Sequence, residues 1–428
     1  MAACALASAR VRDGAMPKRI SESVRVAGSY SEVYFSAAKS AVSADFEKSM
    51  RPDFIRAHVL LALTSIQYGQ ATNVQQYVGK ALTLSAMQRF HDERHWPQGA
   101  TEMQKEVYRR IYWCTYNLDV YCAVVWNCFM RTQEVHANVR YPSDFDDDSH
   151  SVSVDSPDSY GGISWLHGWN FTIDLYRVLE HAMNKARAKR FRSDDRRTVD
   201  NLFFQDNFSD KDVMQTMLNM YYELPRQFKE TPPMTGDPKK DVFAFQAANI
   251  QATLQLLRMI LFSMEDGPGV ERRCDVAGEV LSVFHTIPVR YLRAISTPLV
   301  YQLGCIGHVL GSVLEEPLSQ ELYERIRQSL VSMADLLDTL ESVLHHGAGA
   351  SHGLRAQVDK LDQYMRSRRG APPPIMMPPH PNQMSMTDLS GSLPMQGGLH
   401  DLQLATEMTT DWPWMYFDQG AYNYPGAF

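Results

Sequence analysis

The chain has 428 residues, 44% of them apolar, which predicts one large domain or two to three small ones around a sizeable core. Its formal net charge of −7 excludes a protein that binds nucleic acid over its whole surface, because phosphate contacts need a basic face. The six cysteines include no C-x2-C pair for zinc, the N-terminus lacks a basic signal-peptide region, and no apolar run could span a membrane, so we expect an intracellular, reduced protein.

Apolar residues recur at helical spacing along most of the chain. At Thr101, a T-x-x-Q pattern predicts a capping box that starts a helix. The stripe that follows, at steps of four and three, consists of Val107, Ile111, Cys114, Leu118, Tyr121 and Val125. Similar runs span residues 52–68, 74–87, 163–190, 210–228, 240–264, 273–287, 289–314, 318–346 and 352–369. Because period-two runs are scarce, we expect an all-α, multi-helical, bundle-like domain of ten or more helices with disordered termini.

Composition divides the chain into four parts. These are a flexible basic segment (residues 1–28), a helical domain (29–370), a Pro/Met-rich linker (371–400) and an acidic, aromatic tail (401–428). Two loops rich in turn residues, Tyr141–Gly162 and Lys229–Lys240, interrupt the helical domain.

The tail from Asp401 to Phe428 contains four acids, seven aromatic residues and no lysine or arginine. Interspersed acids keep aromatic side chains solvated and available, which is typical of an acidic activation segment that binds partner proteins. The residues we expect to make these contacts are Asp411, Trp412, Trp414, Tyr416 and Phe417. The alternative is a tail that folds back onto the domain.

Two basic clusters could carry further functions. Seven of the thirteen residues from Lys185 to Arg197 are basic, which fits a nuclear import signal, a phosphate-binding patch or simply a solvated helix end. The candidate import residues are Lys185, Arg187, Lys189, Arg190 and Arg192. The second cluster, near the N-terminus, consists of Arg10, Arg12, Lys18, Arg19 and Arg25.

The order of features between residues 50 and 150 is more specific than any one of them. A Leu/Ala-rich helix, AHVLLALTSIQYG, is followed by VGKALTLSAMQRFH, then by an acid, a basic pair, an aromatic residue and Leu-Asp, and finally by Pro with an acidic cluster. The single residues of this pattern are Glu106, Arg109, Arg110, Trp113, Leu118, Asp119 and Pro142, with Asp146, Asp147 and Asp148. The pattern resembles the middle homology region of fungal binuclear zinc-cluster transcription factors. The family's Gly-Arg-Pro element is replaced here by NCFMR, Asn127 to Arg131, and its six-cysteine zinc cluster is absent.

The resemblance implies a nuclear transcription regulator that controls a set of metabolic genes, with a biosynthetic gene cluster as one option. It implies partners in the transcription machinery or among co-regulators, and contact with DNA only indirectly or through a zinc cluster outside this chain. The helical domain would restrain or license the tail in response to a metabolite or partner, with a homodimer or a heterodimer as one option. We expect no cofactor, catalytic residue or metal ligand in this chain.

The motif residues are expected to form a scaffold helix. Glu106 lies three and four positions before Arg109 and Arg110, where exposed ion pairs contribute about 0.2–0.5 kcal/mol each. Asp119 lies at the edge of the buried stripe and needs a donor, which Tyr112, Tyr116 or a basic residue on a packed helix could supply.

Two alternatives from other classes stay open. One is an all-α, Mg²⁺-dependent enzyme acting on a hydrophobic substrate, suggested by Asp144 and Asp146–Asp148, although their spacing is not D-D-x-x-D. The other is a scaffold protein without transcriptional activity.

His345 and His346 are adjacent at a predicted helix end. Their rings would point about 100° apart, which makes them a poor chelating pair, so we expect them to contact the carbonyl groups at the end of the helix. Three glycines, Gly304, Gly307 and Gly311, indicate close helix packing, with a bound ligand as the alternative.

Overall fold

The computed structural model describes residues 1–15, 30–42, 47–143, 163–191, 210–263, 270–311 and 319–370. These residues form thirteen α-helices and no strand, which confirms the all-α prediction. The helices are α1 (Ala2–Arg12), α3 (Ser31–Ala41), α4 (Pro52–Gln67), α5 (Ala71–Met87), α6 (Glu102–Val125), α7 (Leu166–Phe191), α9 (Asp210–Glu223), α10 (Pro238–Ser263), α11 (Val270–Thr286), α12 (Val289–Ile295), α13 (Thr297–Gly311), α14 (Gln320–Glu341) and α15 (Ala350–Gly370). Short 3₁₀ turns include η2 (Glu93–His95), η3 (Glu134–His136) and η5 (Arg226–Phe228).

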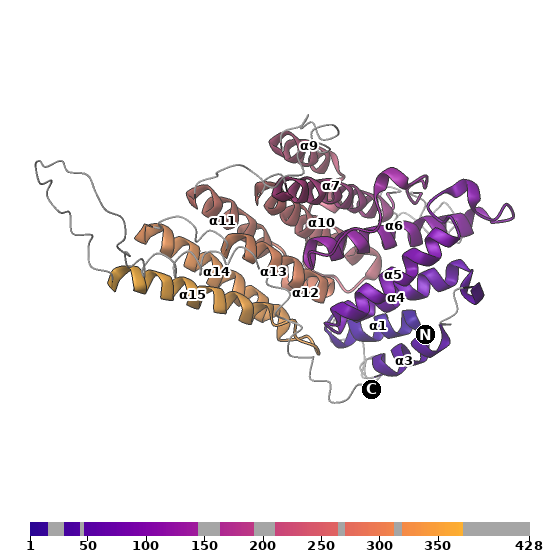
Figure 1. Ribbon diagram of the computed structural model, residues 1–428, viewed down its shortest axis with the longest axis horizontal. Coiled ribbons are helices and arrows are strands. Elements are labelled where there is room, and N and C mark those ends of the chain that lie inside the picture. Colours follow the sequence, from indigo (N-terminus) through magenta and orange to yellow (C-terminus); the bar gives the residue numbers. More distant parts are fainter. Residues whose placement is uncertain are drawn as a thin grey trace, which may run out of the picture.

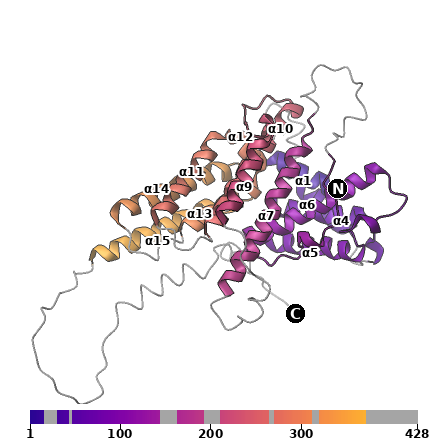
Figure 2. The same ribbon diagram turned by 90° about the horizontal axis from the view of Figure 1, so that it is seen from above.

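The helices from the early part of the sequence and those from its late part lie toward opposite ends of the long axis of the molecule (Figure 1). The first five, α1 and α3–α6, lie at one end, and α11 and α13–α15 lie side by side at the other (Figures 1 and 2). Helix α10 lies between the two ends, because it packs against α7, which contacts α6, and against α11, α12 and α13. No helix within the described ranges is both long and apolar enough to cross a bilayer.

Helix α6 begins where the sequence predicts. The Thr101 hydroxyl accepts the Gln104 backbone N–H at 3.2 Å, and the Gln104 side chain accepts the Thr101 N–H at 2.9 Å, so the capping box is confirmed. Most of the predicted stripe is buried, but Val107 and Cys114 are only partly buried. These two side chains face a cavity.

The stripe on α14 packs within its own chain. Ile326, Leu330, Met333 and Leu337 are buried, and α14 lies against α13 and α15. A Cβ atom on Gly307 would lie 2.6 Å from a Leu354 methyl carbon, so α13 and α15 meet closely at this glycine. The described residues therefore use the apolar stripe on α14 and this glycine for core packing.

The first residues of the chain differ from the expectation of a flexible segment over 1–28. Residues 2–12 form α1, in which Ala5 and Ala9 are fully buried and the helix packs on α3 and α4. Arg10 donates through Nη1 to the carbonyl oxygens of Ala294 and Ile295 at 2.6 and 2.9 Å. Small alanine side chains give a weak hydrophobic pattern, yet they allow close helix contact, which explains the difference.

Candidate functional site

After α6 ends, the chain returns along it as residues 127–143, here called the return segment. Arg109, which is 4% exposed, donates from Nε and Nη2 to both carboxylate oxygens of Glu93, at 2.8 and 2.9 Å, and also pairs with Glu106. The two acids in turn accept backbone N–H groups of the return segment, from Arg140 and Ser143, at 2.8 and 2.9 Å. A buried guanidinium thus fixes α6, η2 and the end of the return segment together.

The aromatic residue of the motif adds a second attachment. Trp113 donates its indole N–H to the carbonyl of Arg140 at 2.9 Å, and its ring meets Tyr141 edge-on with centroids 5.0 Å apart. The carbonyl of Pro142 accepts the side-chain amide of Asn170 on α7 at 3.0 Å. The return segment is therefore held between α6 and α7.

Asp119 anchors the start of the same segment. Its carboxylate is 1% exposed, and Oδ2 accepts the backbone N–H groups of Arg131 and Thr132 and the Thr132 hydroxyl at 2.7, 2.9 and 3.0 Å. Burial raises the pKa of Asp119, and these hydrogen bonds offset part of that rise. The expected donors were Tyr112, Tyr116 or a basic residue on a packed helix, but the observed donors belong to the return segment, and Tyr116 donates to Glu180 at 2.6 Å. Leu118, its neighbour, is buried in the core.

The expectation of weak, exposed ion pairs on α6 is wrong for Arg109, because its pairs with Glu93 and Glu106 are shielded from solvent. Removing one partner of a buried ion pair costs far more stability than an exposed ion pair contributes. Arg110 follows Arg109 directly but lines a cavity on another side of α6.

This cavity has a volume of about 590 Å³, within the range typical of small-molecule sites. It lies among α4, α6, α7 and α10, with contributions from α1, α12 and α13. Its lining on α6 consists of Val107, Arg110, Ile111, Cys114, Asn117, Leu118 and Tyr121. The other walls are Arg10, Arg56, Val59, Leu60, Leu63, Ile66, Trp165, Trp169, Thr172, Tyr176, Phe245, Gln246, Asn249, Ile295 and Pro298.

A few polar groups interrupt the apolar lining. Gln246 is 6% exposed, and its Oε1 has no hydrogen-bond partner among the described residues; the same holds for Oδ1 of Asn117. Buried polar atoms are nearly always paired in native proteins, so these two oxygens are free to accept a ligand donor. The guanidinium of Arg110 supplies positive charge. The cavity suits an apolar molecule with a hydroxyl or amide group and an anionic or carbonyl end.

Covalent chemistry is not favoured at this cavity. Burial raises the pKa of the Cys114 thiol to about 11, so the side chain is a thiol at neutral pH and a poor nucleophile. Burial likewise raises the pKa of Cys122 well above its usual value. The sequence carries no sign that Cys114 lines a void, because a cavity wall and a packed core have the same spacing.

The predicted import cluster is only partly described. Lys185 and Arg187 lie on α7. Arg187 donates to the carbonyl of Ala123 in the last turn of α6 and to the carbonyl of Cys128, which follows that helix. The side chains of Lys189 and Arg190, and residue Arg192, lie outside the described part. The predicted partner-binding residues of the tail also lie outside it: Asp411, Trp412, Trp414, Tyr416 and Phe417. The acidic residues that follow the return segment in sequence also lie outside the described part: Asp144, Asp146, Asp147 and Asp148.

The sequence matches the fungal specific transcription factor domain over residues 2–231, more than half of the chain. The match runs from α1 to η5 and contains both the clamped side of α6 and most of the cavity lining. No curated protein and no solved structure matches the chain. The domain is typical of transcription regulators with a nuclear role and is not an enzyme family. The chain therefore belongs to the fungal specific transcription factor domain family, and its function is transcription regulation.

Proposed function

We propose that this regulator responds to a mainly apolar small molecule in the cavity behind α6 and acts on the transcription machinery through its acidic-aromatic tail, residues 401–428. The observation that carries the proposal is the position of the cavity, most of whose lining belongs to the family domain. One wall of the cavity is formed by α6, the helix that bears the family motif, on a different side from the return segment. The genes controlled would be a metabolic set, and a DNA-bound partner or a zinc cluster outside this sequence would supply contact with DNA.

The composition of the cavity wall supports a regulatory role. Its residues come from segments as far apart in sequence as Arg10 on α1 and Pro298 on α13. A ligand that fills this space contacts all these segments at once and favours the arrangement that holds them together. A ligand shifts the equilibrium between two conformations of a protein by its difference in affinity for them. In this proposal, the two conformations differ in the accessibility of the tail, so the ligand changes that accessibility.

The output half of the proposal is tested by tethering residues 401–428 to a heterologous DNA-binding domain in a reporter strain. We expect activation that is lost when Trp412, Trp414 and Phe417 are replaced together by alanine. A triple variant of Tyr422, Tyr424 and Phe428, three aromatics outside the predicted contact set, is the matched control. A tethered tail that fails to activate would remove the activator hypothesis.

The input half is tested by filling the cavity in the full chain, fused to the same DNA-binding domain. Cys114→Phe adds a ring where a void exists, while Cys4→Phe adds the same ring at an exposed thiol of α1. We expect reporter output to change several-fold with Cys114→Phe and to stay at the wild-type level with Cys4→Phe. Equal output from all three proteins, at equal abundance and helical content, would contradict a regulatory cavity.

A further inference from the structure

The connection between α14 and α15, residues 342–349, passes beside α3 at the other end of the sequence. Helix α14 ends at Glu341, whose carboxylate accepts the first backbone N–H groups of α15, from Ala350 and Ser351, at 2.9 and 3.1 Å. His345 and His346 therefore lie in a bend and not on a helix, contrary to the sequence-based expectation. Their ring centroids are 4.7 Å apart.

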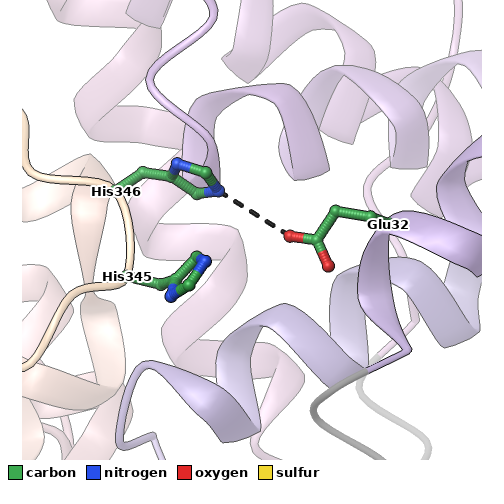
Figure 3. A group of neighbouring side chains, drawn as sticks. All are labelled: Glu32, His345 and His346. Atoms are coloured by element: carbon green, nitrogen blue, oxygen red, sulfur yellow. Dashed lines mark ion pairs between the residues drawn. The ribbon is translucent and has the colours of Figure 1, made fainter.

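Both imidazoles point toward Glu32 on α3 (Figure 3). One ligand atom from each of the three side chains lies within 4.8 Å of the others. Nε2 of His346 is 3.7 Å from Oε1 of Glu32, too far for a hydrogen bond. This nitrogen is shielded from solvent and has no hydrogen-bond partner within the ranges that the structure describes. An imidazole nitrogen and a carboxylate thus face each other across a gap that small side-chain rotations could fit to a metal ion.

Buried groups hold the ligand residues in position. Asp13, which is fully buried, accepts the His345 backbone N–H at 3.1 Å and the Gln67 amide at 2.7 Å. The Tyr68 ring packs on His346 with centroids 5.2 Å apart, and its hydroxyl hydrogen-bonds to Ser31 beside Glu32. Arg12 donates to Oε1 of Glu32 at 2.5 Å, which orients the carboxylate while its charge limits the affinity for a cation.

We propose that Glu32, His345 and His346 bind a divalent metal ion of the zinc class through two imidazole nitrogens and one carboxylate oxygen. Such a ligand set suits zinc, with a fourth position open to water. The ion would join α3 to the α14–α15 connection and so link the two ends of the helical domain. This site is separate from the cavity and does not depend on a ligand there.

The test uses the untagged full chain, freed of metal with a chelator and titrated with Zn²⁺ by calorimetry. All proteins carry Cys4→Ser, so that the exposed thiol cannot bind the metal. We expect one zinc per chain, with affinity reduced about 100-fold by His345→Ala with His346→Ala and about tenfold by Glu32→Gln. His352→Ala, which removes an exposed histidine on α15 outside the cluster, should bind as the wild type does.

Hydrogen exchange provides a second readout that does not depend on calorimetry. Zinc should slow amide exchange in residues 31–41 and 342–349 of the wild type and leave both segments unchanged in the double histidine variant. Circular dichroism without metal checks that the variants fold. Equal zinc affinity in wild type and double variant, or the absence of stoichiometric binding and of protection in these segments, would overturn the site.

Discussion

The two sides of α6 use adjacent arginines differently. Arg109 is buried between two acids and fixes the return segment, whereas Arg110 lines a cavity of about 590 Å³. On the first side, Glu93 accepts hydrogen bonds from the Arg109 guanidinium and the Arg140 backbone N–H, and Glu106 accepts the Ser143 backbone N–H. On the second side, oxygens of Asn117 and Gln246 are buried and have no partner within the described residues. One helix thus combines a side that holds the fold with a side that is open to a ligand.

Residues on the two sides of α6 should therefore be detected by different measurements. Residues on the clamped side should change the free energy of unfolding and affect binding only through loss of structure. Residues on the cavity side should change ligand binding while the free energy of unfolding stays nearly constant. Single substitutions on each side of α6 test this difference.

The largest loss of stability is expected from Arg109→Ala. Removing the guanidinium leaves Glu93 and Glu106 mostly buried without their common counter-charge, and breaking a buried pair costs about 3–5 kcal/mol. Urea denaturation should show a lower midpoint, and Arg109→Lys should fall between the wild type and Arg109→Ala because lysine cannot bond both oxygens of Glu93. An unchanged midpoint for Arg109→Ala would mean that the pair is not part of the scaffold.

Asp119→Ala should cost less, about 2 kcal/mol, because the lost acceptor leaves the N–H groups of Arg131 and Thr132 to find water or stay unpaired. The local consequence should be faster amide exchange at Arg131 and Thr132, measured by hydrogen exchange. Protection of both amides at the wild-type level would show that other groups hold the start of the return segment.

His58 on α4 offers a contrast with Arg109, because it is a buried ionisable group with no ion-pair partner among the residues that the structure describes. Burial, helped by the charge of Lys80, lowers the pKa of His58 to about 4 from its ordinary 6.5. The unfolded chain then binds a proton more readily, so stability present above pH 6.5 is lost as the pH falls toward 4. Between pH 7 and pH 5 the loss should be about 1–2 kcal/mol. His58→Gln should remove this part of the pH dependence in denaturation curves, and an identical slope in both proteins would contradict the shifted pKa.

Arg110→Ala should have the smallest effect on stability, about 1 kcal/mol or less, because its guanidinium borders an open cavity. Its denaturation curve should nearly overlay that of the wild type, far from that of Arg109→Ala. A loss as large as that of the neighbouring variant would mean that the two sides of α6 are not functionally separate.

Much of the scaffold can be predicted from the sequence, because helix starts and buried stripes have local causes. The capping box at Thr101 and the stripe on α6 follow from spacing alone. Helix α1 is missed because buried alanines leave a weak pattern. The donors to Asp119 are missed because two of them are backbone N–H groups, which every residue carries.

The cavity and the histidine cluster depend on contacts between distant segments. Spacing cannot distinguish Cys114 beside a void from Cys114 inside a packed core. The approach of His345 to Glu32 depends on where α14 ends, which Glu341 and Gly349, with φ of 68°, help to set. Periodicity extended that helix too far and so placed the two histidines on it.

The most direct test of the division across α6 is the binding of dodecanoate, an apolar chain with one carboxylate, measured by calorimetry on the full chain. We expect Arg110→Ala to weaken binding at least tenfold, since a hydrogen bond to a charged group contributes about 1.5–3 kcal/mol. Cys114→Phe should abolish binding, and both variants should keep the wild-type denaturation midpoint. Equal dodecanoate affinity in all three proteins would show that the cavity behind α6 is not a ligand site.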